Sequence, residues 1–518
     1  MKRKSILSIV FGVAIINGCS KLDERFLGDT TQGTVASNSA NTNILLQSLY
    51  NSMGSVFASH FRVFPLQELC TDEAIFPTRG TDWDDNGMWR ALHQQKWTPN
   101  HEEIRECFNR LNGIVFAATD LLRYNPTAEE KAEARFVRAW IMYQLLDMFD
   151  QVPYREPGES LIQPAKVRKG VEALNYIIGE INAVENNLLA GPVNRANKYA
   201  AKVLLMKCYL NKAVYENRLN ALHSPVDMDK VIRLADEIIT TGPFSFSQNY
   251  FDNFAPDNTS KGKENIFTLL NEAGSTPNNF IFFAWLLSMH YNQGVGLNGC
   301  ATLSGFYDKF ESFDKRRGMV YSTAGSPGNP ANAINVGFLI GQQYDYFTGA
   351  PLSDRTGSPL IFTRQVRNTE TGTNLEVTGI RPIKYFPDWA NLFSPDNDFV
   401  FFRLSDVLLM KAEAILRGGT GTNAGSYGNT AKSIVNAIRT HSSRGASTLS
   451  TVGLDDVYDE RGRELWWECW RRQDMIRFQK FLEPFQEKYY QSDPKYLVYP
   501  IPDEQLAVNP NLAQNPTY

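Results

Sequence analysis

The chain has 518 residues, more than an ordinary single domain contains, and its 43% hydrophobic and 12% aromatic content is that of a globular protein. Its formal net charge is −4 and it has no block of basic residues, which argues against nucleic acid as a partner. The cysteines after Cys19 are widely spaced and form no CxxC pair, so the sequence indicates neither a cysteine-based zinc site nor a disulfide scaffold.

The N-terminus has the pattern of a secretory signal peptide. Three basic residues, Lys2 to Lys4, precede an apolar run from Ile6 to Ile16 that is too short to span a bilayer. The sequence INGCS then places small residues before Cys19, as in a bacterial lipobox. We therefore predict a signal peptide at 1–18, lipid on Cys19 and a polar tether at 19–40. The alternative is an ordinary secreted protein in which Cys19 has no special role.

Helical periodicity dominates the rest of the chain. One example is the apolar face formed by Ala132, Phe136, Ala139, Tyr143 and Leu146. The pentapeptide VLLMK occurs twice, at 203–207 and 407–411, each time in a helical pattern. We predict a mainly α fold with a tetratricopeptide-like helical-repeat scaffold and no extensive sheet. The expected helix pairs lie at about 101–149, 168–216, 227–240 with 403–417, and 429–480; a plain helical bundle is the alternative.

The stretch from about 243 to 400 differs in composition. It is rich in Asn, Gly, Pro, Ser and Thr, which are turn and loop residues. Long irregular segments within helical proteins often carry function. We therefore expect one domain over 41–518, with helical repeats at about 41–242 and 403–480, a loop-rich ligand-binding insert at about 243–400 and a closing segment at 481–518.

The sequence RGTDWDDNGMW, residues 79–89, partly matches a calcium-loop template. Asp82, Asp84, Asn86 and Gly87 satisfy its first half, but position 12 is His93, a poor ligand for a hard cation. We predict no metal ion and no cofactor here, and a looser calcium site remains an alternative.

The same residues fit a sugar better. A sugar ring has an apolar C–H face, which Trp83 or Trp89 can cover, and hydroxyl groups that acids can accept from and Arg79 can donate to. The alternative is that the tryptophans belong to the core and the acids form a turn. The candidate ligand-binding residues of this stretch are Arg79, Asp82, Trp83, Asp84, Asp85 and Trp89.

Common catalytic motifs are missing from the sequence. It contains no HExxH, no GxSxG, no phosphate-binding loop and no dinucleotide-binding fingerprint. A glycosidase needs only two well-placed carboxylates, whose separation a sequence does not reveal. A surface glycosidase therefore stays open as an alternative at this point, as does a scaffold that binds only protein.

Several motifs resemble the SusD/RagB-like family. ERGRELWWECWRRQDMIRF (460–478) resembles its ER–EL–EG–R–DL–R motif, and YLVYPIPDEQLAVNPNLAQNPTY (496–518) is similar to its C-terminal ending. RFVRAWIMYQLLDMFDQVPYREP (135–157) and FRLSDVLLMKAEAIL (402–416) are similar to its helical motifs. Two positions depart from the pattern, Cys469 and Thr517, where the family usually has glycine.

The resemblance implies an outer-membrane, surface-facing lipoprotein that is not an enzyme. Such a protein covers a SusC-like TonB-dependent transporter barrel and delivers oligosaccharides or, in some members, peptides to it. The resemblance also implies that the loop after the first helices meets the mid-chain insert at the ligand site. On the insert side we expect Cys300, in NGCATL, and Arg381 to contribute, with Tyr291, Tyr344 and Tyr346 as weaker candidates.

Overall fold

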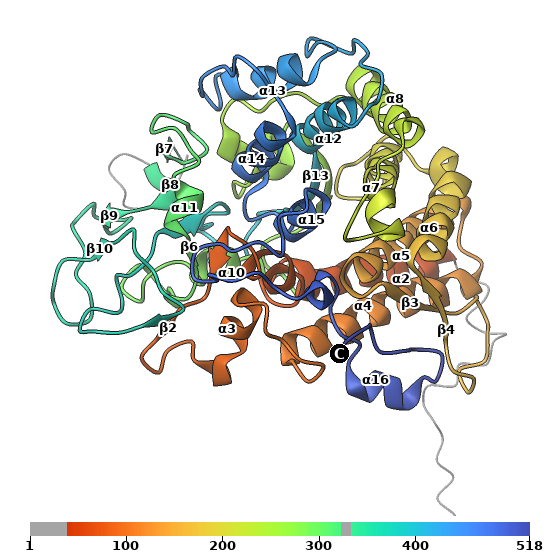
Figure 1. The fold of residues 1–518 in the computed structure, drawn as a ribbon, viewed down its shortest axis with the longest axis horizontal. Coiled ribbons are helices and arrows are strands. Elements are labelled where there is room, and N and C mark those ends of the chain that lie inside the picture. The colour runs from red at the N-terminus through yellow and green to blue at the C-terminus, as the bar shows by residue number, and fades with distance from the viewer. Residues whose placement is uncertain (1–38, 323–332) are drawn as a thin grey trace, which may run out of the picture. The chain divides into compact units, whose positions relative to one another are not determined.

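The structure is a computed structural model that describes residues 39–322 and 333–518 (Figure 1). Ser39–Tyr518 group into one compact unit. The predicted signal peptide and lipidated Cys19 lie outside the described residues, and so does almost all of the tether. Within the described part, every helix is too short or too polar to cross a membrane.

The first half of the described chain is a series of antiparallel helix pairs, in which α4 contacts α5, α5 contacts α6, and so on to α8. Helix α5 begins at a capping box, in which Thr127 accepts from the backbone N–H of Glu130 and the Glu130 side chain accepts in return. The helices are α2 (Ser39–Phe57), α4 (Glu102–Leu121), α5 (Ala128–Phe149), α6 (Gly170–Val184), α7 (Lys198–Glu216) and α8 (Pro225–Thr241).

A second set of helices closes the series, with α12 in contact with α7, α8, α13 and α14. The two VLLMK copies lie on neighbouring helices: Lys207 of α7 donates to Asp406 of α12, and Lys411 of α12 donates to Asp236 of α8, each at 2.6 Å. The mainly helical, tetratricopeptide-like prediction is confirmed, including the pairing of α8 with α12. The helices are α12 (Leu404–Leu416), α13 (Ala431–Thr440), α14 (Leu454–Leu465) and α15 (Arg471–Arg477).

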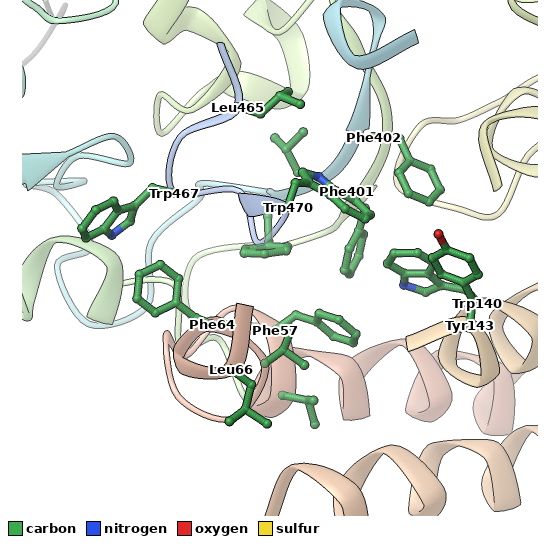
Figure 2. Packing of buried hydrophobic residues seen from close by; sticks show 14 of the residues in the cluster. Phe57, Phe64, Leu66, Trp140, Tyr143, Phe401, Phe402, Leu465, Trp467 and Trp470 are labelled. Atoms are coloured by element: carbon green, nitrogen blue, oxygen red, sulfur yellow. The ribbon is translucent and has the colours of Figure 1, made fainter. Parts of the chain in front are cut away.

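Aromatic side chains from distant parts of the chain meet in the core (Figure 2). Trp140 of α5 packs edge-on against Phe402, with ring centroids 4.9 Å apart, and contacts Trp470 at 6.0 Å. Phe64 contacts Trp467 at 5.5 Å. Buried aromatic pairs of this kind dominate packing energy, so the core joins the first helices to the C-terminal motif.

The motif at 460–478 forms buried ion pairs. Glu464 accepts from Arg316, Arg403 and Arg444, all fully or almost fully buried. Burial raises the pKa of Glu460, but Arg316 and two further arginines outweigh it and lower the pKa to about 2. Breaking one partner of a buried pair leaves an uncompensated charge, so this motif serves the fold rather than a ligand.

Both departures from the family pattern occur at unusual backbone conformations. Cys469 has φ of 65° and Thr517 has φ of 69°. Glycine is the residue that adopts positive φ without steric cost. The glycine usual in the family at these two positions therefore has a backbone reason, and this chain tolerates two bulkier residues there.

The region from 243 to 400 contains only short elements. Strand β5 (Asn265–Leu269) pairs with β13 (Phe399–Arg403), and β8 (Ala333–Leu339) lies between β7 (Gly318–Ser322) and β12 (Arg381–Ile383).

Further short strands and helices occur in this region and elsewhere in the described chain. Such strands are β3 (Gln151–Tyr154), β4 (Lys166–Lys169), β9 (Gly341–Gln342) and β10 (Ile361–Phe362). The short helices are η1 (Pro65–Leu69), η2 (Asp85–Gly87), α3 (Met88–His93), η3 (Leu122–Tyr124), η4 (Glu185–Asn187), η5 (Tyr250–Asn253), α9 (Asn258–Lys261), α10 (Phe283–Leu286), α11 (Ser304–Tyr307), η6 (Pro494–Leu497) and α16 (Asp503–Val508).

Two short strand pairs bring the 79–89 loop to this region. Strand β1 (Ala74–Ile75) pairs with β6 (Ala301–Thr302), and β2 (Thr78–Arg79) pairs in parallel with β11 (Thr369–Glu370). The loop after the first helices therefore meets the mid-chain region, which is the juxtaposition that the family resemblance implied.

Candidate ligand-binding surface

The loop between β2 and α3 has an unusual backbone. Five of its residues have positive φ: Gly80, Trp83, Asp85, Asn86 and Gly87, with φ of 69°, 61°, 38°, 52° and 79°. For a bulky residue such as tryptophan this is a genuine outlier, and strained backbone of this kind clusters at ligand sites. Main-chain hydrogen bonds between Arg79 and Asp82, at 2.9 and 3.1 Å, hold the loop in this shape.

Trp83 is partly exposed and firmly held. Its Nε1 donates to the Leu297 carbonyl at 2.9 Å, and its ring packs edge-on against Phe76 at 5.2 Å. Gly299 lies directly against the indole, since a Cβ atom there would be 2.6 Å from Cζ2 of Trp83. One edge of the ring is thus fixed by the 297–299 loop while part of the side chain reaches solvent.

Three of the predicted ligand contacts are interior residues. Trp89 is 2% exposed, and its Nε1 donates to Asp85 Oδ2 at 2.5 Å. Cys300 and Arg381 have no exposed surface. A side chain without accessible atoms offers nothing to a ligand, so we do not carry these three forward as ligand contacts.

Arg79 and Arg381 form a buried pair of cations beneath the surface. Neither has a carboxylate within ion-pair distance among the described residues, in contrast to Arg316, Arg403 and Arg444. Burial lowers the pKa of Arg79 to about 10, and burial followed by the charge of Arg79 lowers that of Arg381.

The hydrogen bonds of these two guanidinium groups go mainly to backbone carbonyls. Arg79 donates to the carbonyls of Asn298 and Gly299 at 2.7 and 2.8 Å, and to that of Thr378 at 2.8 Å. Arg381 donates to the Cys300 carbonyl at 3.2 Å. The pair therefore positions the loop that holds Trp83, and the role predicted for Arg79 as a donor to the ligand becomes a positioning role.

A polar face adjoins Trp83. Asp82 Oδ2 accepts from the Tyr291 hydroxyl at 2.7 Å and from Arg355 at 3.3 Å, and Arg355 also stacks on the Tyr291 ring at 4.1 Å. Burial, and then the bond to Asp82, raise the pKa of Tyr291 to about 12, so this hydroxyl remains a donor at neutral pH. We call Asp82, Trp83, Tyr291, Arg355 and Glu376 the Trp83 surface; Glu376 pairs with Arg355.

The acids of the loop do not converge on a common point. Asp84 accepts from Arg90 at 2.7 Å, Asp85 accepts from Trp89, and Asp82 faces Tyr291. Both ring nitrogens of His93 contact backbone carbonyls. In residues 39–322 and 333–518, no group of three or more His, Cys, Asp or Glu is placed to hold a metal ion.

A second aromatic cluster borders the same mid-chain loop; of its residues the sequence predicted only Tyr346, as a weaker candidate. Trp389 contacts Tyr346 at 5.2 Å and Phe347 at 4.8 Å, and it lies next to Gly294. The loop that includes Gly294 and Leu297 therefore touches Trp389 near one end and Trp83 near the other. The available signal was a tryptophan in the turn-rich sequence FPDWAN.

The fold and this surface define a helical scaffold that presents an irregular, partly aromatic region. A sequence profile of the SusD family matches residues 245–518, and the chain belongs to this family. Over an alignment of 499 residues, the chain is 25% identical to starch-binding protein SusD of Bacteroides thetaiotaomicron. The alignment covers 88% of this chain and 85% of that protein. The chain is 23% identical over 489 residues to SusD-like protein P25 of Formosa agariphila, with 88% and 82% covered.

Solved structures show the same fold. A laminarin-binding SusD-like protein matches with a TM-score of 0.68 and 17% identity, covering 93% of this chain and 100% of that one. Surface glycan-binding protein A from Bacteroides thetaiotaomicron, solved with laminarihexaose, matches with a TM-score of 0.62 and 16% identity, covering 92% and 99%. These relatives are named as binding proteins, and none of these names describes an enzyme.

Proposed function

We propose that this protein binds oligosaccharides or polysaccharides at the cell surface without catalysis and delivers them to a SusC-like TonB-dependent transporter in the outer membrane. In this proposal Cys19 carries the lipid that holds the chain at the membrane. Membership of the SusD family supports the proposal, as do relatives named for binding starch, laminarin and surface glycans.

The observation that carries the proposal is the position of Trp83. A partly exposed indole lies beside a carboxylate, a phenol and a guanidinium group, held in place by a backbone conformation that is costly for tryptophan. An aromatic face stacks on the C–H face of a sugar, and the neighbouring polar groups exchange hydrogen bonds with its hydroxyls. Trp389, with Tyr346 and Phe347, offers a second aromatic surface that borders the same 294–297 loop.

The test is a titration of the purified protein against neutral polysaccharides, including starch and laminarin, with product analysis of each mixture. We expect binding on the order of micromolar to millimolar, about −4 to −8 kcal/mol, since a protein that passes its ligand on gains little from tighter binding. We expect no shorter products. Release of shorter oligosaccharides would establish a glycosidase, and binding of peptides but of no glycan would contradict the choice of ligand.

The delivery step has its own test. Affinity purification of the full-length lipoprotein from outer membranes of its own cells should retain a β-barrel transporter. Glycan binding without any barrel partner would contradict the delivery step while leaving the binding proposal intact.

A further inference from the structure

A cavity lined by other residues than those of the Trp83 surface lies elsewhere on the molecule. Its volume is about 320 Å³, and its lining comes from α4, the connection from β3 to β4, and the C-terminal segment with α16. Figure 1 shows the position of these elements in the fold. The side-chain amides of Asn509 and Asn511 both donate to the Ala165 carbonyl at 3.0 Å. These bonds tie the connection to the C-terminal segment, so the walls of the cavity are preformed.

The apolar part of the lining is exposed to an unusual degree. Phe116 of α4 is 45% exposed and its ring contacts no other aromatic ring in the described part of the chain. Ile162 is 89% exposed and Val508 is 69% exposed on the opposite walls. Apolar side chains from three separate segments converge here, and the exposed aromatic ring of Phe116 is among them.

The polar part of the lining consists mainly of side-chain amides. Asn112, Gln163, Gln505 and Asn509 line the cavity, and the amides of Gln163 and Gln505 make no hydrogen bond to another described residue. An amide offers both a donor and an acceptor, which is the match for a hydroxyl group. A purely apolar partner would leave these amides unpaired at a cost.

Charge is scarce around the cavity. Among the described residues that line it, Arg155 is the one charged side chain, and it already donates to the Ser160 carbonyl at 2.8 Å. The site therefore offers an aromatic ring for stacking and side-chain amides that can bind hydroxyl groups, but little charge to attract an ionic ligand. That combination fits an uncharged, polyhydroxylated ring.

We propose that this cavity is a second glycan subsite, which takes a sugar unit of a neutral glycan against Phe116. The inference rests on the proposed function, because it concerns the same class of ligand. Helix α4 leads from the 79–89 stretch to the cavity: its N-cap residue His101 contacts the Met88 carbonyl of α3 at 3.1 Å, and Phe116 lies fifteen residues further, about 22 Å along the helix. A polymeric glycan that reaches both sites binds with avidity, whereas a short one occupies each site separately.

The experiment compares a polysaccharide that binds the wild type with its trisaccharide. Phe116→Ala should weaken polysaccharide binding about tenfold or more and leave trisaccharide binding at the Trp83 surface unchanged. Gln505→Ala should act in the same direction. The matched control is Phe313→Ala, because Phe313 is 58% exposed and lies outside the cavity. Equal polysaccharide affinity in the Phe116→Ala and Phe313→Ala variants would overturn the subsite.

A direct readout separates this inference from the proposed function. Isotope-labelled methyl groups of Ile162 and Val508 should shift on addition of the trisaccharide, both in the wild type and in Trp83→Ala, and should not shift in Phe116→Ala. Unchanged methyl signals with intact binding at Trp83 would overturn the second subsite alone. Shifts at Ile162 with full binding retained in Trp83→Ala would support this subsite and contradict the Trp83 surface.

Discussion

Gly299→Ala is the perturbation that tests how Trp83 is held. A Cβ atom at this position would lie 2.6 Å from Cζ2 and 2.7 Å from Cε2 of Trp83, whereas ordinary van der Waals contact begins at 3.4 Å. The indole would have to move by about 0.8 Å, the difference between these two distances. It is restrained by the bond from its Nε1 to the Leu297 carbonyl, so the movement strains that bond.

Overpacking of this kind costs roughly 1–3 kcal/mol of stability. Because displacement of a stacking ring weakens its contact with a ligand, we also expect glycan affinity to fall about tenfold. The control is Gly305→Ala, where an added Cβ atom would meet only the Gln486 side chain at 3.7 Å. Calorimetric titration gives the affinity, and denaturant unfolding of the same samples gives the stability.

The reasoning would be refuted if Gly299→Ala kept wild-type affinity and lost no stability, as we expect of the Gly305→Ala control, where alanine within helix α11 should lower neither quantity. A loss of stability with full affinity would show that the indole can move without consequence for the ligand. In that case Trp83 would be a packing residue.

Three further predictions concern the rest of the molecule. Thr517→Gly should raise stability by about 1 kcal/mol, because a β-branched residue at φ of 69° is strained; thermal unfolding measures this, and a loss would contradict it. Burial raises the pKa of Glu73 to about 8, so its contribution to stability falls as the pH rises from about 4.5 to about 8. Glu73→Gln should flatten that fall in unfolding measurements, and an unchanged slope would exclude Glu73 as its source. Cys19→Ser should move the protein from the membrane fraction to the soluble fraction, and membrane retention would contradict the predicted lipid site.

The helices could be predicted from sequence because their signal is local. An apolar residue at every third or fourth position marks a buried face wherever the partner helix lies. The expected pairing of 227–240 with 403–417 is also present, as α8 and α12, and the Lys411–Asp236 ion pair lies at that contact.

The candidate site was harder to predict because burial is a tertiary property. Trp89 stands among acids in the sequence, which suggested exposure, yet Asp85 accepts its indole N–H and the ring lies in the core. Arg381 resembled a ligand donor, but its guanidinium binds carbonyls of the 298–300 and 376–378 loops. Trp389 went unnoticed because its aromatic neighbours lie about forty residues earlier in the chain.

The central claim is that Trp83 contacts the glycan, and the most direct measurement is the affinity of Trp83→Ala and Trp83→Phe for a glycan that binds the wild type. We expect the alanine variant to lose about tenfold or more in affinity while it still unfolds cooperatively, and the phenylalanine variant to keep most of it, because phenylalanine retains an aromatic face. Wild-type affinity in a folded Trp83→Ala protein would contradict the claim.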